Sequence, residues 1–220
     1  LRRYGVWYTM GRSLAFAMWS VFSRVEVVGR EYVPPYGPLI IAANHQSYAD
    51  PPLMMRSFRR PIWFMAKRSL FQIPLIGSLL RHFHAYPVGR DSRDTAAISW
   101  ALTMLEADKA VLLFPEGTRS PGSLRKAADG LVYLALRSRA PIIPVAITGT
   151  EHISGILRVI FPFCRLTVTM GQSFTLPLIE GNLQRAQLDE LSTMVMERIA
   201  RLLPARYRGE YSLPRSSSSQ

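Results

Sequence analysis

Residues 40–53, with the sequence IIAANHQSYADPPL, pass from an apolar run into a polar turn and then into two prolines. The apolar run, which in full spans 38–43, has the length and uninterrupted hydrophobicity of a strand buried on both faces. Proline is favoured in the first turn of a helix, and here it follows Asp50 directly. We therefore predict a strand, a turn that holds Asn44 and His45, and a helix that starts at Asp50.

The same alternation of strands and helices continues over most of the chain. Further strand-like runs occupy residues 25–28, 62–65, 110–114, 142–147 and 165–170, and a short extended segment spans 85–88. Helical patterns occupy residues 94–107, 129–137 and 183–203. This order predicts an α/β fold with a mixed, largely parallel sheet flanked by helices.

One domain accounts for the length of the chain. Its 220 residues, 48% of them hydrophobic, are enough for one sizeable core and require no second one. We place this domain at residues 25–205, between an N-terminal segment at 1–24 and a C-terminal tail at 206–220. The tail ends in PRSSSSQ, which buries too little surface to order itself and is expected to be flexible.

Residues 1–24 form the most membrane-like part of the sequence. The apolar run from Leu14 to Phe22 is well under the roughly 20 residues that a spanning helix needs. The segment mixes aromatic and basic residues: Trp7, Tyr8, Phe16, Trp19 and Phe22 with Arg2, Arg3, Arg12 and Arg24. We predict a helix or helix pair in the membrane interface, or alternatively a helix packed on the protein's own core. Because the first residue is Leu and not Met, we also expect the natural chain to begin further upstream.

A strong positive charge restricts the choice of partner. The chain has 27 Lys and Arg against 15 Asp and Glu, for a net charge of +12. Such a charge favours an anionic partner, but no zinc-finger, RNP or basic-zipper pattern indicates nucleic acid. We predict that the basic runs at 56–61 and 66–69 contact an anionic phospholipid surface or an acidic acyl carrier protein. An ordinary solvated face is the alternative. The single cysteine, Cys164, excludes an internal disulfide.

Residues able to carry chemistry follow three of the predicted strands. His45 and Asp50 follow the run at 38–43, the sequence PEGTRS at 115–120 follows the run at 110–114, and Arg90 follows 85–88. Ligands of open α/β sheets bind beyond the carboxyl ends of the strands, so we expect these side chains to converge at one edge.

The pair His45 and Asp50 is a candidate general base. An imidazole accepts a proton near neutral pH, and a carboxylate on its other nitrogen fixes the tautomer and stabilises the imidazolium. Capping of the following helix is the alternative role of Asp50. In the second motif, Arg119 offers a planar fork for phosphate oxygens, and Glu116 could accept hydrogen bonds from hydroxyls or hold Arg119. The alternative for this motif is an ordinary polar loop.

The sequence NHQSYAD, followed 71 positions after its histidine by the glutamate of FPEGTRS, resembles the paired signatures of the glycerolipid acyltransferases. It is most similar to those of the 1-acylglycerol-3-phosphate (lysophosphatidic acid) acyltransferases. The similarity covers roughly residues 25–150, with a connecting block that ends at Arg90 and a fourth block around Pro144. It implies a glycerol-3-phosphate acyltransferase-like fold.

The resemblance also implies the role of each site residue. His45 is then the base and Asp50 its orienting partner, and the acceptor's glycerol phosphate is bound by Arg90, Glu116, Gly117, Thr118 and Arg119. Where many family members have Phe-Lys-x-Gly after this motif, the present chain has LRKAADG. We expect Lys126 to supply the missing charge from a shifted position.

The implied reaction moves a fatty acyl group from acyl-CoA or acyl carrier protein to the free sn-2 hydroxyl of lysophosphatidic acid, which gives phosphatidic acid in phospholipid biosynthesis. A thioester is already activated, so no protein nucleophile, metal or organic cofactor is implied. We expect the protein to lie at the cytoplasmic face of the membrane, in the interface. The alternatives are a related acyltransferase with another acceptor, such as glycerol 3-phosphate or another lysophospholipid, and a non-catalytic peripheral lipid-binding protein.

Overall fold

A seven-stranded sheet forms the centre of the computed structural model, which describes residues 6–89, 95–155, 158–159, 161–177 and 184–212. The strands are β1 (Arg24–Val28), β2 (Leu39–Ala43), β3 (Ile62–Lys67), β4 (Ala85–Val88), β5 (Ala110–Leu113), β6 (Ile142–Thr148) and β7 (Arg165–Met170). Their spatial order is β1-β7-β6-β2-β5-β3-β4, and every neighbouring pair is parallel except β6 and β7. The predicted mixed, largely parallel sheet is therefore confirmed.

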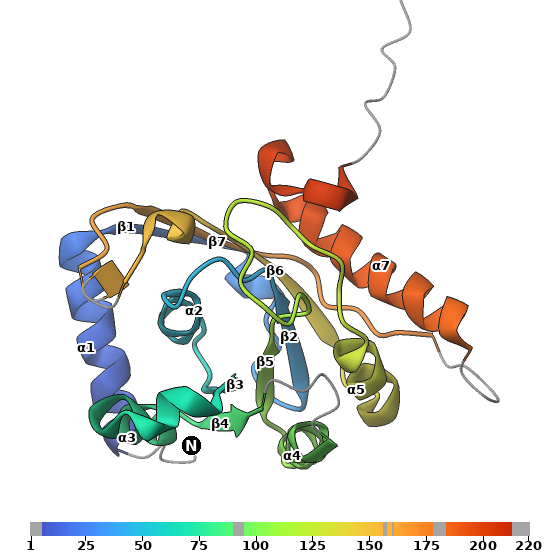
Figure 1. Ribbon diagram of the computed structural model, residues 1–220, viewed down its shortest axis with the longest axis horizontal. Coiled ribbons are helices and arrows are strands. Elements are labelled where there is room, and N and C mark those ends of the chain that lie inside the picture. Colours follow the sequence, from blue (N-terminus) through green and yellow to red (C-terminus); the bar gives the residue numbers. More distant parts are fainter. Residues whose placement is uncertain (1–5, 90–94, 156–157, 160, 178–183, 213–220) are drawn as a thin grey trace, which may run out of the picture.

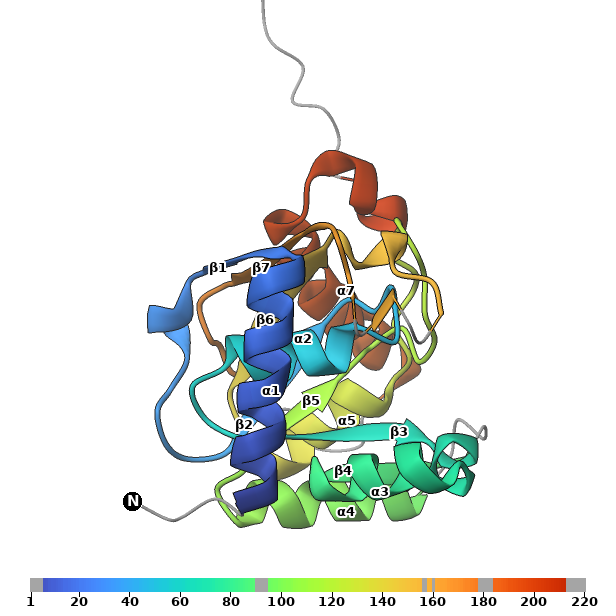
Figure 2. The same ribbon diagram turned by 90° about the vertical axis from the view of Figure 1, so that its left-hand side faces the viewer.

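Helices cover both faces of this sheet, and the sheet curves around one of these helices (Figures 1 and 2). The longer helices are α1 (Val6–Phe22), α2 (Asp50–Ser57), α3 (Pro74–His82), α4 (Thr95–Glu106), α5 (Gly130–Ser138) and α7 (Arg185–Leu202). Helix α2 lies in the concave side of the sheet, with α1 spanning that side from β1 toward α3. Helices α4, α5 and α7 cover the other face. The short 3-10 helices are η1 (Arg30–Tyr32), η2 (Arg68–Gln72), η3 (Thr150–His152), η4 (Ala205–Tyr207) and η5 (Gly209–Tyr211).

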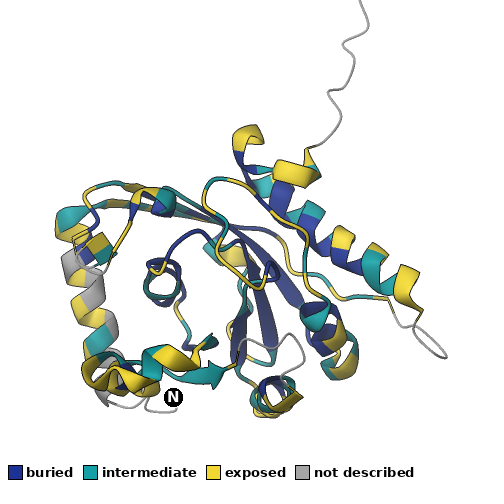
Figure 3. Cartoon of the chain, in the orientation of Figure 1, coloured by how far each residue is buried: buried dark blue, intermediate teal, exposed yellow. Residues whose placement is uncertain are grey.

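Burial is greatest in the middle of the sheet (Figure 3). All five residues of β2 are buried, as the uninterrupted apolar run predicts for a strand covered on both faces. Strand β1 differs, because exposed and half-buried positions alternate along it and Glu26 is exposed. The reason is that β1 is an edge strand and is covered on one face only.

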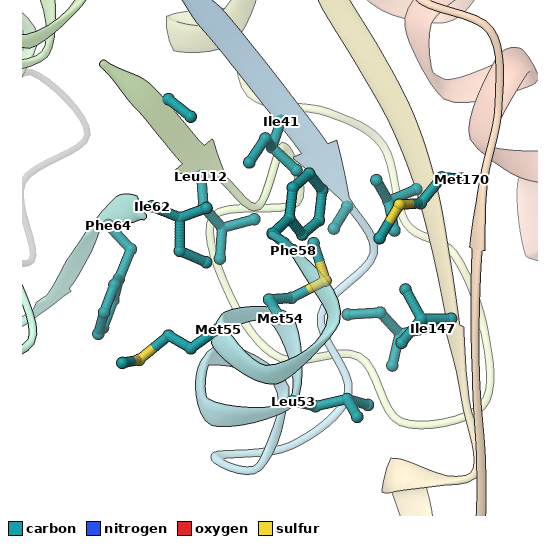
Figure 4. Packing of buried hydrophobic residues seen from close by; sticks show 14 of the residues in the cluster. Ile41, Leu53, Met54, Met55, Phe58, Ile62, Phe64, Leu112, Ile147 and Met170 are labelled. Atoms are coloured by element: carbon teal, nitrogen blue, oxygen red, sulfur yellow. The ribbon is translucent and has the colours of Figure 1, made fainter. Parts of the chain in front are cut away.

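Two hydrophobic clusters hold the layers together. On the concave side, Leu53, Met54 and Phe58 of the α2 region pack over Ile41 and Ile147 of the sheet (Figure 4). The second cluster joins the opposite faces of β2, β5 and β6 to α4, α5 and α7. Helix α2 is therefore anchored by its apolar side chains, which fixes the turn that precedes it.

Helix α1 is docked on the core through one of its faces. Trp19 is only 3% exposed, and its indole Nε1 donates a hydrogen bond to the carbonyl oxygen of Val159 (3.1 Å). A Cβ at Gly11 would approach the ring of Phe83 to 2.2 Å, so the helix backbone lies close to that ring. At Trp19 the structure therefore agrees with the alternative prediction, a helix packed on the protein's own core. Phe22 also contacts another side chain of the protein, because its ring packs edge-on against that of Phe161.

Several residues of the predicted interfacial segment lie outside the description. These are Arg2 and Arg3, together with the side chains of Trp7, Tyr8, Arg12 and Phe16. None of the helices in the described part of the chain combines the length and the hydropathy needed to cross a bilayer.

The C-terminal region differs from the predicted flexible tail up to residue 211. Residues 205–211 form η4 and η5, and Tyr207 is 4% exposed within the second hydrophobic cluster. The tail prediction considered only the polar residues at the very end of the chain and missed this apolar anchor. Residues 213–220 lie outside the described part.

Candidate active site

The parallel pairing of β2 and β5 brings the two sequence motifs together. Ala42 of β2 is in register with Leu113 of β5, so the carboxyl ends of these strands meet at one edge of the sheet. His45 follows β2, and the segment 114–129, which we call the arginine loop, follows β5. Strand β4 is separated from β5 by β3, and Arg90 lies outside the described residues, so its predicted place at this edge stays a prediction.

His45 and Asp50 form a hydrogen-bonded pair. The imidazole Nδ1 lies 2.7 Å from Oδ2 of Asp50, and the carboxylate is fully buried. The same oxygen accepts the backbone N–H groups of Gln46 (2.6 Å) and Ser47 (2.8 Å). The turn thus wraps around the carboxylate, which keeps the carboxylate and the imidazole in one geometry. A carboxylate only accepts hydrogen bonds, so Nδ1 carries the proton and the lone pair is on Nε2.

The second nitrogen of His45 remains accessible. Nε2 has no hydrogen-bond partner among the described residues, and it is not a buried atom. The side chain is 17% exposed, and its ring stacks on Phe114 with centroids 4.0 Å apart. Stacking on one face and the Asp50 bond on one edge leave the Nε2 edge for a substrate proton.

Helix capping does not account for Asp50. The N-cap of α2 is Ala49, and Asp50 is the first helical residue without a side-chain capping bond. The next two residues, Pro51 and Pro52, have no backbone N–H, so the first turn lacks two of the donors that a capping side chain normally satisfies. The capping alternative is therefore wrong in this structure, and the carboxylate is turned toward the histidine.

Three polar neighbours of His45, for which the sequence predicted no role, hold the turn. Asn44 exchanges two hydrogen bonds with the backbone of Ile147 (2.9 and 2.7 Å), as a neighbouring strand would. Gln46 donates to the same carbonyl (2.7 Å) and accepts the N–H of Gly122 (2.9 Å), while Ser47 donates to the carbonyl of Ile153 (2.8 Å). The signal in the sequence was a run of consecutive polar residues next to a buried strand. Buried polar groups need hydrogen-bond partners, so such a run indicates that these side chains bond to the surrounding backbone.

Glu116 links the arginine loop to the histidine. Its Oε1 accepts the backbone N–H of His45 (2.9 Å), and its Oε2 accepts that of Arg125 (3.1 Å). The side chain is buried, and this burial raises the pKa of Glu116 to about 7, although both backbone donors oppose the shift. The carboxylate therefore holds the backbone of the site and does not pair with Arg119, one of the two roles proposed from the sequence.

Arg119 is exposed, and its guanidinium lies over the ring of Tyr48 at 3.7 Å from the centroid. No hydrogen bond or ion pair engages it within the described part of the chain. Stacking on an aromatic face leaves the in-plane N–H donors of a guanidinium available. Nearby, Gly117 has a φ of 67°, and a Cβ there would meet no atom within 4 Å. Thr118 is exposed.

Lys126 forms an ion pair with helix α7. Its Nζ lies 3.7 Å from Oδ1 of Asp189 on α7, and both side chains are partly exposed. The ion pair follows from the packing of α5 against α7, which brings the end of the arginine loop to that helix. Its predicted phosphate contact stays a prediction. Among the described residues, no group of three or more His, Cys, Asp or Glu is placed to hold a metal ion.

The fold and the site together define an α/β protein with a candidate general base. At the carboxyl edge of its largely parallel sheet lie a buried carboxylate, an accessible imidazole and a loop that carries an arginine. Residues 24–148, more than half of the chain, match the family described as "Acyltransferase". The chain therefore belongs to the acyltransferase family.

Proteins with similar sequences and folds have related names. The "1-acyl-sn-glycerol-3-phosphate acyltransferase" of Bacillus subtilis is 32% identical over 131 residues, 59% of this chain and 65% of that protein. The protein of the same name from Saccharomyces cerevisiae is 33% identical over 133 residues, 58% of this chain and 44% of its own. The crystal structure of the 1-acyl-sn-glycerophosphate (LPA) acyltransferase PlsC from Thermotoga maritima superposes with a TM-score of 0.68 at 26% identity, covering 90% of this chain and 81% of that one. The match to these two sequence relatives thus spans less than two thirds of their length.

Proposed function

We propose that this protein transfers a fatty acyl group from an acyl thioester, acyl-CoA or acyl carrier protein, to the sn-2 hydroxyl of lysophosphatidic acid, and so forms phosphatidic acid. The observation that carries the proposal is the Nδ1 to Oδ2 bond of 2.7 Å between His45 and Asp50, which leaves Nε2 as an accessible base. The names of the similar proteins support the choice of acceptor.

The proposed step needs one base and no covalent intermediate on the protein. Nε2 of His45 takes the proton of the acceptor hydroxyl as its oxygen attacks the thioester carbonyl. The tetrahedral intermediate then collapses, the C–S bond breaks, and the imidazolium returns the proton to the leaving thiolate. Asp50 stabilises the imidazolium between these two proton transfers. A thioester is reactive enough for this direct route, so the proposal includes no metal or organic cofactor.

Arg119 is the proposed anchor of the acceptor phosphate. Its guanidinium is held flat by Tyr48 with its donors unengaged, and a planar fork binds two phosphate oxygens at once. The arginine loop is tied to His45 through Glu116, which fixes the distance between anchor and base. The predicted contributions of Arg90 and Lys126 would add charge from other segments.

The assay that tests the function is release of free thiol from acyl-CoA in mixed micelles, with and without lysophosphatidic acid. We expect release only with acceptor, together with formation of phosphatidic acid. For Arg119→Ala we expect the acceptor KM to rise about tenfold to a hundredfold, with little change for acyl-CoA, because charge-assisted bonds to phosphate are lost. A monoacylglycerol, which lacks the phosphate, should be equally poor for both forms.

Other results would point elsewhere. Release without acceptor would identify a thioesterase, and turnover with glycerol 3-phosphate in place of lysophosphatidic acid would move the protein to another acceptor class. No turnover with acyl-CoA but turnover with acylated carrier protein would identify acyl carrier protein as the donor. An equal loss for Arg119→Ala with both acceptors would contradict its phosphate contact.

An anionic membrane surface is the proposed partner, and the outward face of α1 is where it would bind. Met10, Leu14 and Val21 are 56%, 62% and 74% exposed. At 100° per residue they share one stripe, on the side opposite Trp19. Leu75 and Leu79 of α3 are also exposed, and the C-terminal end of α3 lies beside α1, where Gly11 approaches the ring of Phe83.

Basic residues on the same half of the chain would contact lipid phosphates. Lys67 and Arg68 are exposed before α3, and no Asp or Glu occurs between Asp50 and Asp91. Arg60 has another role, because its guanidinium donates to the carbonyls of Pro34, Gly37 and Asp108. Arg60, although it belongs to the basic run at 56–61, therefore stabilises the fold.

We expect the double variant Leu14→Glu/Val21→Glu to bind vesicles that contain phosphatidylglycerol at least about tenfold more weakly than the wild type, because two apolar contacts with acyl chains are replaced by charges. Cosedimentation measures this. Tyr133→Glu is the matched control: Tyr133 is 51% exposed on α5, in the opposite layer, and should leave binding unchanged. Unaltered binding of the double variant would remove α1 from the interface.

A further inference from the structure

The arginine loop is held from two sides, and the second side comes from the end of the chain. On the first side, His45 accepts the N–H of Ser120 through its carbonyl (2.7 Å), and Gln46 accepts that of Gly122. On the second side, the backbone N–H of Leu124 donates to the carbonyl of Tyr207 (2.8 Å). Figure 1 shows this loop rising from β5 toward η4 and η5. We call residues 203–211, which make the second contact, the C-terminal clamp.

The clamp fits closely against the loop. A Cβ at Gly209 would lie 2.2 Å from the carbonyl oxygen of Leu124 and 2.5 Å from Oγ of Ser123, so the two backbones are in direct contact. The side chain of Leu124 is 2% exposed and packs in one cluster with Leu203 and Tyr207. The loop segment just after Arg119 therefore depends on the clamp for its position.

One partly buried hydrogen bond ties the clamp to the segment that follows β6. The hydroxyl of Tyr207 donates to Oε1 of Glu151 in η3, directly after β6. Oε2 of Glu151 accepts the backbone N–H of Gly149 (2.8 Å), so both carboxylate oxygens are engaged. Burial and this bond raise the pKa of Tyr207, which keeps the hydroxyl protonated as the donor. The end of β6 and the stretch after it provide Ile147 and Ile153, whose backbone groups hold the turn around His45.

We infer that Tyr207 and Glu151 are positioning residues that set the arginine loop, and with it Arg119, relative to His45. Neither touches the reacting atoms. Their bond couples the clamp to the same structural block as the base, so that loop and base keep one geometry. The inference rests on the proposed function, because it assigns the loop to the acceptor.

Tyr207→Phe tests this with the smallest change, since the ring stays in the core and only the hydroxyl is lost. The hydroxyl also accepts a hydrogen bond from Nη2 of Arg206 (3.2 Å), which lies within the clamp itself. We expect the acceptor KM to rise about three- to tenfold, with kcat and the acyl-CoA KM within about twofold of wild type. We also expect the backbone amide hydrogens of Ser120 and of residues 122–125 to exchange several-fold faster, measured by mass spectrometry. Tyr133→Phe is the matched control, since it removes an exposed hydroxyl from α5.

A second substitution checks the partner. Glu151→Gln retains one acceptor oxygen and should give a smaller effect of the same kind. Added to Tyr207→Phe, it should change the acceptor KM little further, because the bond between Tyr207 and Glu151 is already absent. The other contact of Oε1, with Nε2 of His152 (3.4 Å), does not involve the clamp.

Both changes in Tyr207→Phe are required by the inference. Loop exchange at the wild-type rate overturns it, as does faster exchange with an unchanged acceptor KM. A lower melting temperature with equal KM changes for both substrates would make Tyr207 structural only. Loop exchange needs no turnover: if the wild type fails to acylate lysophosphatidic acid, the proposed function falls, while the exchange data still show whether the clamp holds the loop.

Discussion

His45→Ala is expected to lower acceptor-dependent thiol release by at least about 10²- to 10⁴-fold, the usual contribution of a positioned general base. The other described groups that are hydrogen-bonded to Asp50 are the backbone N–H groups of Gln46 and Ser47, and neither can accept a proton in place of Nε2. The acceptor hydroxyl would then have to attack while still protonated. Phosphatidic acid formation under saturating acyl-CoA and lysophosphatidic acid is the measurement.

The structure also predicts that this variant folds. Oδ2 of Asp50 keeps the backbone donors of Gln46 and Ser47 after the imidazole is removed, so the carboxylate is not left without partners. The melting temperature and vesicle binding should therefore stay close to those of the wild type. His82→Ala, which removes an exposed imidazole from α3, is the matched control and should leave turnover unchanged. A fully active His45→Ala protein would exclude His45 as the base.

Asp50→Asn should give the second largest loss, about 10²- to 10⁴-fold in kcat, with little change in either KM. The amide oxygen of asparagine can take the place of Oδ2 and accept the same three donors, so the turn and the tautomer of His45 are retained. What is lost is the negative charge beside the imidazolium that forms in the reaction. The loss should therefore appear in the chemical step and not in binding.

The control for this variant is the same chemical change at a surface position. Asp108 is exposed with a φ of 59°, a conformation that asparagine tolerates well, so Asp108→Asn should keep both stability and turnover. A kcat for Asp50→Asn within about tenfold of the wild type would mean that the carboxylate orients His45 but contributes little charge stabilisation. A raised acceptor KM in its place would show that the turn itself had moved.

Part of the site was predictable because it lies within single segments. His45 and Asp50 are five positions apart, and one buried strand followed by one proline-marked helix is enough to bring them together. The approach of the arginine loop followed from the rule that parallel strands end at a common edge. Neither prediction required the packing of distant side chains.

Other residues owe their roles to contacts that composition does not reveal. Trp19 looks like an interfacial aromatic in the sequence, yet it fills the core, because the face of α1 that meets the sheet is decided by the whole fold. Glu116 could equally have held a hydroxyl or Arg119, but it accepts the backbone N–H of a residue 71 positions earlier. Tyr207 lies in a region that we predicted to be flexible, and it is buried by contacts with Leu124 and Glu151.

The α/β class, the buried central strands and the His45–Asp50 pair were all predictable, because each depends on local periodicity or on residues that are near one another along the chain. Tertiary structure alone decided that Glu116 fixes the backbone of the site, that Lys126 pairs with α7, and that the end of the chain clamps the arginine loop. The physical reason is that a buried polar group takes whichever partner the packing brings within hydrogen-bonding distance, and that partner can lie anywhere in the chain.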